Sequence, residues 1–184
     1  METPDFIPSI PTFKNELKSH YKTAYDTFTK AFKQIETDPS VAVGLANSAL
    51  ESIIKEILKD DRISSKVTGN ETLYTLTSII LKEFNFTSDE HPKEIKTIEN
   101  SLLAINQAIE KLRSEMTDFH GKTDGDYLIR DTVYTYFVVN TVATVGLFIS
   151  SYYKTKYPKP FAQPDDSLPF CRSNKMFMQW GGSV

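Results

Sequence analysis

An arginine and a histidine near the middle of this chain have residue types and spacing suited to phosphate chemistry. Arg113 and His120 lie seven positions apart, at the end of a long amphipathic pattern, and Gly121 follows the histidine. An arginine can hold a phosphate through paired hydrogen bonds, and a histidine can give or take a proton near neutral pH. The pair therefore has the chemistry needed to cleave a phosphodiester without a metal ion.

The spacing allows two arrangements of this pair. In a continuous helix both residues would share one face, with their backbones about 10.5 Å apart. A helix that ends near Met116 would instead let His120 fold back toward Arg113. Either arrangement could form half of a phosphate-binding cleft. The alternative is that Arg113 is a solvated helix residue and that His120 caps a carbonyl in a loop.

The elements that must position these residues are predicted to be helices. Apolar residues recur at spacings of three and four, which is typical of amphipathic helices, and no segment shows the period-two alternation of a strand. The predicted fold is therefore an all-α, up-and-down bundle of about five helices. Their expected ranges are from after Pro11 to Ile35, from Pro39 to near Asp60, about 71–84, from Pro92 to Met116, and about 126–154.

The chain is predicted to contain one folded domain and a tail. Its 184 residues suffice for one well-buried core, which we place in residues 1–157. The segment 158–184 contains four prolines and is predicted to be extended. It also carries Phe161, Phe170, Phe177 and Trp180, which suggest that the tail docks on the bundle.

The expected last helix contains an apolar run from Val133 to Ile149. Asn140 and several threonines interrupt it, and it falls short of the roughly 20 apolar residues that span a bilayer. We therefore expect a buried core helix, either central to the bundle or covered by another subunit, and no stable membrane insertion.

Composition excludes several other kinds of function. A net charge of −3 argues against sequence-independent coating of nucleic acid. A single cysteine and the lack of a leader-like start fit a cytoplasmic protein. The three histidines lie far apart, there are no cysteine pairs, and no glycine-rich phosphate loop is present. We therefore expect neither a metal nor a cofactor.

Three segments together resemble the abortive-infection C-terminal family of the HEPN superfamily. The first is 38–58, with small residues, a glutamate and an aliphatic end; the second is the Leu-Arg to His-Gly block; the third is 139–144. The resemblance covers roughly residues 38–153. It implies a HEPN-like helical bundle, and many HEPN proteins are metal-independent ribonucleases with an arginine, four to six residues, and a histidine. Six residues separate Arg113 from His120 here.

The resemblance also implies a mechanism and partners. Arg113 would hold the scissile phosphate, and His120 would be the general acid or base while the RNA 2′-hydroxyl attacks the adjacent phosphorus. RNA is the implied partner, the cleft would be shared across a homodimer, and the setting would be antiphage defence or a toxin–antitoxin pair. An antitoxin or a sensor protein would then be a further partner.

Four more residues are candidates for supporting roles. Ser114 stands where the family often has asparagine, and it reaches less far, so it is either a weaker donor or a plain surface residue. Glu51 matches the family glutamate and could orient Arg113 or His120, or simply face solvent. Asp118 could raise the pKa of the histidine, and Lys122 could contact a phosphate, although both could also be loop residues without partners.

The competing hypothesis is a non-catalytic HEPN-like module. The same bundle could bind RNA, a nucleotide or a protein partner, with the aromatic tail as a docking strip. The acidic net charge and Ser114 favour this alternative.

Overall fold

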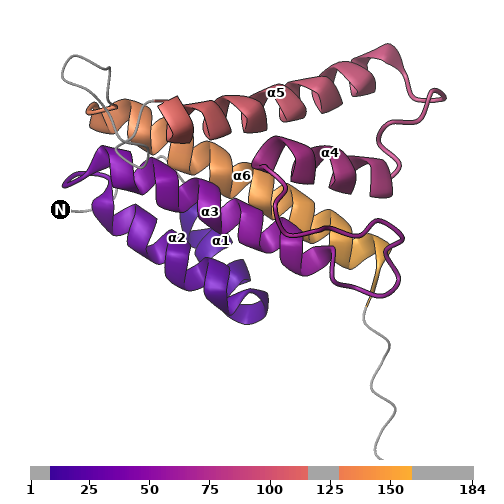
Figure 1. Ribbon diagram of the computed structural model, residues 1–184, viewed down its shortest axis with the longest axis horizontal. Coiled ribbons are helices and arrows are strands. Elements are labelled where there is room, and N and C mark those ends of the chain that lie inside the picture. The colour runs from indigo at the N-terminus through magenta and orange to yellow at the C-terminus, as the bar shows by residue number, and fades with distance from the viewer. Residues whose placement is uncertain (1–8, 116–128, 159–184) are drawn as a thin grey trace, which may run out of the picture.

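The computed structural model describes residues 9–115 and 129–158, and these form a bundle of helices without strands. This confirms the all-α bundle predicted from apolar spacing. Six helices follow one another along the chain (Figure 1): α1 (Ser9–His20), α2 (Lys22–Gln34), α3 (Pro39–Ile57), α4 (Leu73–Glu83), α5 (Lys93–Glu115) and α6 (Thr132–Lys156).

The first expected helix is in fact two helices. The chain breaks at Tyr21, where φ is −139° and ψ is 71°. The apolar spacing continues unchanged through the break, and Tyr21 itself is buried, so the pattern carries no sign of it. The first of the two helices also begins at Ser9, before Pro11, because proline is tolerated in the first turn, where its missing N–H would have no helical partner.

The ends of the other helices lie close to the predicted positions, with one correction. Asp38 caps α3 by accepting from the Val41 N–H at 3.0 Å, and Pro39 follows it in the first turn. The last helix was expected to begin near residue 126, but it begins at Thr132. Asp131 caps it there by accepting from the Val133 N–H at 2.8 Å.

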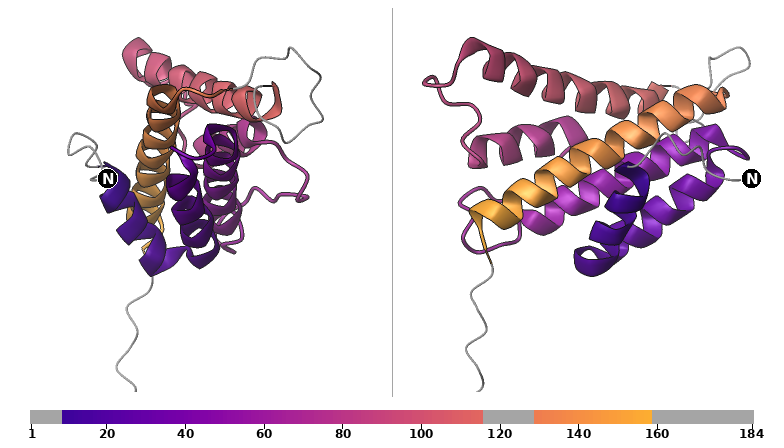
Figure 2. Two further views of the ribbon diagram at one scale, coloured as in Figure 1. Left: turned by 90° about the vertical axis from the view of Figure 1, so that its left-hand side faces the viewer. Right: turned by 180° about the vertical axis from the view of Figure 1, so that it is seen from behind.

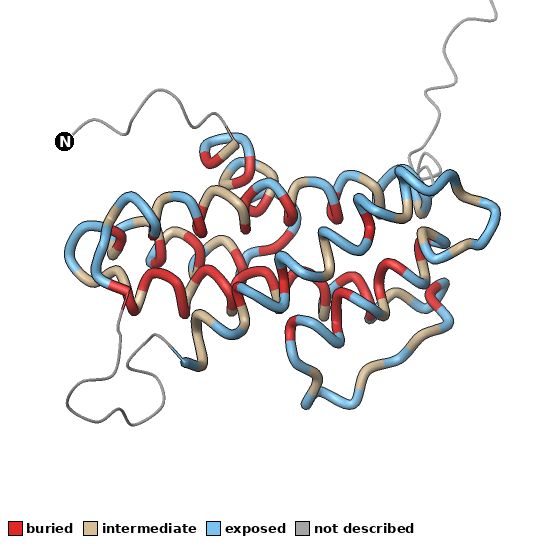
Figure 3. The backbone as a smooth tube through the Cα atoms, turned by 90° about the horizontal axis from the view of Figure 1, so that it is seen from above, coloured by how far each residue is buried: buried red, intermediate tan, exposed pale blue. Residues whose placement is uncertain are grey.

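The core lies between α1, α2, α3 and α6. Helix α3 packs against α2 on one side and α6 on another, and α1 crosses α6 (Figures 1 and 2). Phe13 and Phe28 meet edge to face at 4.8 Å between ring centroids. Buried positions recur as stripes along the helices (Figure 3), as expected for amphipathic helices that each cover one side of a shared interior.

Helix α6 is long and apolar enough to cross a bilayer by length and composition. The same properties are typical of the core helix of a soluble bundle, and α6 packs against α1 and α3. Its burial is incomplete, because Val133 and Phe137 are each 70% exposed. The helix is therefore neither fully central nor fully solvated.

Helix α5 is the outermost element. It packs on α4 and α3, and it runs across the molecule away from the α1–α2 side (Figure 1). From its end at Glu115, where α6 begins nearby, the two helices spread apart toward the other end of the molecule (Figure 2, right).

Candidate functional site

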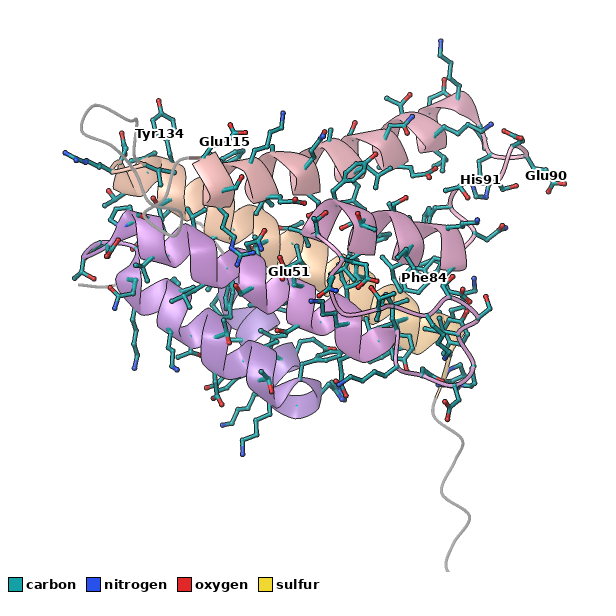
Figure 4. All side chains as sticks on the ribbon, in the orientation of Figure 1. Glu51, Phe84, Glu90, His91, Glu115 and Tyr134 are labelled. Carbon is teal, nitrogen blue, oxygen red and sulfur yellow. The ribbon has the colours of Figure 1, made fainter. Side chains whose placement is uncertain are left out.

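The predicted phosphate-binding arginine lies at the end of α5 and faces α3. Arg113 Nη1 donates to Glu51 Oε1 at 3.1 Å, joining residues 62 positions apart in sequence. The Arg113 side chain is 33% exposed and that of Glu51 is 17% exposed. Figure 4 shows Glu51 on the side of α3 that faces α5. The arginine is thus held in place by a carboxylate while part of its side chain stays open to solvent.

A third polar residue completes this group. Asn47 Nδ2 donates to the same Glu51 oxygen at 2.6 Å. Asn47 is fully buried, and its Oδ1 makes no hydrogen bond within the described part of the chain. Two donors therefore converge on one carboxylate oxygen, which fixes the Glu51 side chain and, through it, the guanidinium.

The sequence explains why these residues meet. Asn47 and Glu51 are four positions apart on α3, so they lie one above the other on one face of that helix. Leu50 and Ile54 beside them are fully buried, which places Glu51 at the border of the core. Asn47 was not among the predicted site residues, although its spacing from Glu51 was a signal that could have identified it.

The remaining predicted residues fall into two groups. Ser114 is described, and its Oγ donates to the Lys111 carbonyl at 3.3 Å, which is a contact within its own helix. His120, Asp118 and Lys122 lie outside the described residues. The structure therefore brings Glu51 to Arg113, and the geometry of the arginine–histidine pair stays a prediction.

The structure describes the other two histidines of the chain. His91 lies in the turn before α5, at the opposite end of that helix from Arg113 (Figure 4). Helix α5 alone separates them by about 30 Å. His91 Nδ1 is 3.0 Å from the Phe86 carbonyl oxygen. His20 ends α1 and is exposed. His120 is thus the histidine that sequence places nearest to Arg113.

A second arginine–carboxylate group lies where α3 ends. Arg62 donates from Nε and Nη2 to Asp60, with distances of 2.6–3.1 Å, and Tyr153 Oη donates to Asp60 at 2.5 Å. Hydrogen bonds from Arg62, then from Tyr153, hold the pKa of Asp60 well below its usual range. Arg62 also donates to the backbone carbonyls of Tyr157 and Pro158. This arginine joins the end of α6 to the α3–α4 loop and so has a structural role.

Within residues 9–115 and 129–158, no group of three or more histidine, cysteine, aspartate or glutamate residues is arranged to hold a metal ion. The described part of the site contains an arginine oriented by a carboxylate. Such a guanidinium is suited to an anionic group such as a phosphate.

The described residues thus form a helical bundle in which an arginine at the end of the long helix α5 is paired with a glutamate on the core helix α3. Comparison with known families identifies the class of protein: the HEPN-like domain model Abi_C matches residues 22–153, well over half of the chain. The chain belongs to this family, as its sequence segments indicated, and the match also includes α2. No curated protein and no solved structure matched the chain.

Proposed function

We propose that this protein is a metal-independent RNA endonuclease of the HEPN type. The observation that carries the proposal is the placement of Arg113 on a HEPN-like domain, held by Glu51 and only a few residues before His120. Two further facts support the proposal. His120 is the histidine nearest to Arg113 in the sequence, and a partly exposed guanidinium can bind a phosphodiester.

In the proposed reaction, Arg113 holds the scissile phosphate and balances the charge that grows on its oxygens. The 2′-hydroxyl of the preceding nucleotide attacks phosphorus, and the bond to the 5′-oxygen breaks. His120 transfers a proton, either taking it from the 2′-hydroxyl or giving it to the leaving oxygen, and solvent or a second group completes the exchange. The products are a 2′,3′-cyclic phosphate and a 5′-hydroxyl.

Glu51 has a positioning role in this proposal. It accepts from both Arg113 and Asn47, so it sets where the guanidinium points without touching the phosphate. A carboxylate beside the arginine also lowers the local positive charge. RNA of any sequence should therefore bind less tightly, and selectivity should depend on the structure of the RNA.

The experiment that tests the proposal is incubation of the purified full chain with total RNA in EDTA. Arg113→Ala should lower the cleavage rate on the order of 10²- to 10³-fold, as loss of a charge-stabilising group does elsewhere. His120→Ala should lower it on the order of 10²- to 10⁴-fold, because a proton-transfer group is lost. Circular dichroism should show unchanged helicity in both variants.

Matched controls are available on the same chain. Lys111→Ala removes an exposed cation two residues from Arg113, and His20→Ala removes an exposed histidine at the end of α1. Both should retain cleavage within a few-fold of the wild-type rate. Cleavage that persists unchanged in Arg113→Ala and His120→Ala would remove these residues from the mechanism, and the activity would belong to another site or to a contaminant.

The second candidate is a non-catalytic HEPN-like binding module. The ion pair favours it, since Glu51 already occupies one face of Arg113. A module of this kind would bind RNA, a nucleotide or a protein partner and would cleave no RNA with or without divalent metal. Binding of RNA that is weakened by Arg113→Ala, in the absence of any cleavage, would favour this function over the nuclease.

The match to the Abi_C family supports a proposal for the biological setting. We propose a role in antiphage defence or in a toxin–antitoxin pair, with a homodimer as the active form and an antitoxin or sensor protein as its regulator. Sedimentation of the purified protein tests the dimer. Growth arrest on expression of the wild type, relieved by His120→Ala, tests the toxic activity.

A further inference from the structure

A groove with apolar walls runs between α5 and α6, with the end of α4 closing one side. It has a volume of about 540 Å³. Ile98, Leu102 and Ile105 line it from α5, and Val145 and Phe148 line it from α6. Ile98 is 66% exposed, so α5 presents large apolar side chains that nothing in the described chain covers. Exposed apolar surface of this kind, rimmed by polar residues, is typical of an interaction site.

One charged residue inside the groove indicates what kind of partner it takes. Glu99 lines the groove and is only 7% exposed. Its carboxylate oxygens are not among the buried side-chain atoms of the described chain that lack a hydrogen-bond partner, so an unpaired oxygen here still reaches solvent in the groove. An apolar occupant would remove that solvent, and a cation or an N–H donor on the occupant would offset the cost. The occupant should therefore be apolar or aromatic and should also carry positive charge.

We propose that this groove binds the segment 170–180 of the same chain. The segment contains Phe170, Phe177 and Trp180 together with Arg172 and Lys175, and it has no acidic residue. Its aromatic rings match the apolar walls, while either cation or the indole N–H can reach the carboxylate of Glu99. The proposal does not depend on nuclease activity.

The tail has a fixed point of departure close to the groove. Arg62 Nη1 donates to the Pro158 carbonyl at 2.8 Å, and Nη2 donates to that of Tyr157 at 3.0 Å. The groove residues of α6 run from Asn140 to Phe148. At the rise of a helix, they lie about 15–27 Å back from Pro158.

The length of the tail matches this span. Phe170 is 12 residues beyond Pro158 and Trp180 is 22 residues beyond it. A flexible chain of these lengths has an end-to-end distance of about 19 Å and about 26 Å, respectively. The effective concentration of a tethered segment is highest when the length of its linker matches the distance to its binding site. Binding of the tail within one chain is therefore favoured over binding of a segment from a separate molecule.

Trp180 is the only tryptophan of the chain, so its fluorescence reports on this segment. In the full-length protein we expect Trp180 to emit at a shorter wavelength than free tryptophan and to be protected from quenching by acrylamide. The double variant Ile95→Gln/Ile98→Gln, which replaces two partly exposed residues of the groove, should shift the emission to the red and raise quenching several-fold. Val133→Gln/Phe137→Gln, at positions 70% exposed on α6 outside the groove, should leave both unchanged.

A second variant tests the charge. Glu99→Gln should weaken docking and make the emission insensitive to salt, whereas in the wild type added salt should shift it to the red. Emission like that of free tryptophan in the wild type would overturn the proposal, as would a blue shift that the groove variants do not change. A blue shift that is lost on dilution would show that the groove holds a segment of a second molecule, and would overturn docking within one chain.

Discussion

Helices α3 and α5 pack against each other, yet they are buried to very different extents. Eleven of the 19 residues of α3 are buried, and they include a nearly continuous set of small and aliphatic side chains. Only three of the 23 residues of α5 are buried, and two of these, Glu99 and Asn106, are polar. Arg113 and Glu51 join the two helices near the end of α5.

The difference shows how stability and function are divided in this bundle. Helix α3 lies at the centre and contacts α2, α4, α5 and α6, so its packing holds the domain together. Helix α5 contributes less apolar burial, and neither amide atom of the fully buried Asn106 side chain is hydrogen-bonded within the described residues. It carries Arg113 near one end and lines the apolar groove along its length.

The largest effect should come from a cavity in the core. Leu50→Ala on α3 removes a fully buried side chain and should lower the free energy of unfolding by about 2–5 kcal/mol. The counterpart on α5, Ile98→Ala, alters a mostly exposed residue and should cost less than about 1 kcal/mol. Chemical denaturation measures both, and equal losses would contradict the division between the two helices.

A smaller loss should follow from adding a side chain where α6 passes close to Phe13 of α1. A methyl group on Gly146 would lie 2.5 Å from two ring atoms of Phe13, which is itself fully buried. Gly146→Ala should therefore destabilise the fold by about 1–3 kcal/mol, even though alanine usually stabilises a helix interior. A raised melting temperature would show that this contact is looser than the structure indicates. Thr144→Ala, at an exposed position of the same helix, is the control.

Helices α3 and α5 should also differ in how readily their backbone hydrogen bonds open locally. Because α5 buries few apolar residues, its backbone amides should exchange with solvent at least about tenfold faster than those of α3 under native conditions. Hydrogen exchange measured residue by residue gives this comparison. Uniform protection of both helices would mean that they unfold together, and that sparse burial does not loosen α5.

The smallest effect concerns the second arginine–carboxylate group. Hydrogen bonds from Arg62 and Tyr153 lower the pKa of Asp60, so their stabilising contribution is present above the ordinary aspartate pKa of about 3.9 and is lost as the pH falls below it. We expect this contribution to be small, because the Arg62 side chain is 42% exposed and solvent screens the pair. Asp60→Asn should flatten this part of the stability curve between pH 5 and 2, whereas Asp61→Asn should leave it unchanged.

Apolar spacing and capping residues were enough to predict most of the fold. Asp38 with Pro39 gave the start of α3, and the three-four rhythm gave the extent of α5. The break at Tyr21 could not be predicted, because the apolar pattern continues through it. The start of α6 at Thr132, after the capping residue Asp131, was missed because the apolar run does not show where the helix begins.

For the candidate site, the sequence identified candidate residues but did not predict which of them are in contact. The family resemblance indicated Glu51 and Arg113 as candidates, and the structure places them 3.1 Å apart. No local pattern predicts that contact, since it depends on how α3 and α5 pack. Glu99 was likewise missed, because a single glutamate in an amphipathic helix is usually solvated and only the packing shows it buried.

The proposed function requires that Arg113 and His120 promote attack by an RNA 2′-hydroxyl without a metal ion. The most direct measurement is single-turnover cleavage in EDTA of an RNA that the protein cuts, compared with the same RNA carrying a 2′-O-methyl group at the nucleotide before the cut. We expect a 2′,3′-cyclic phosphate and a 5′-hydroxyl from the first RNA and no cut at that position in the second. Equal cleavage of both RNAs, or cleavage that requires added metal, would contradict it.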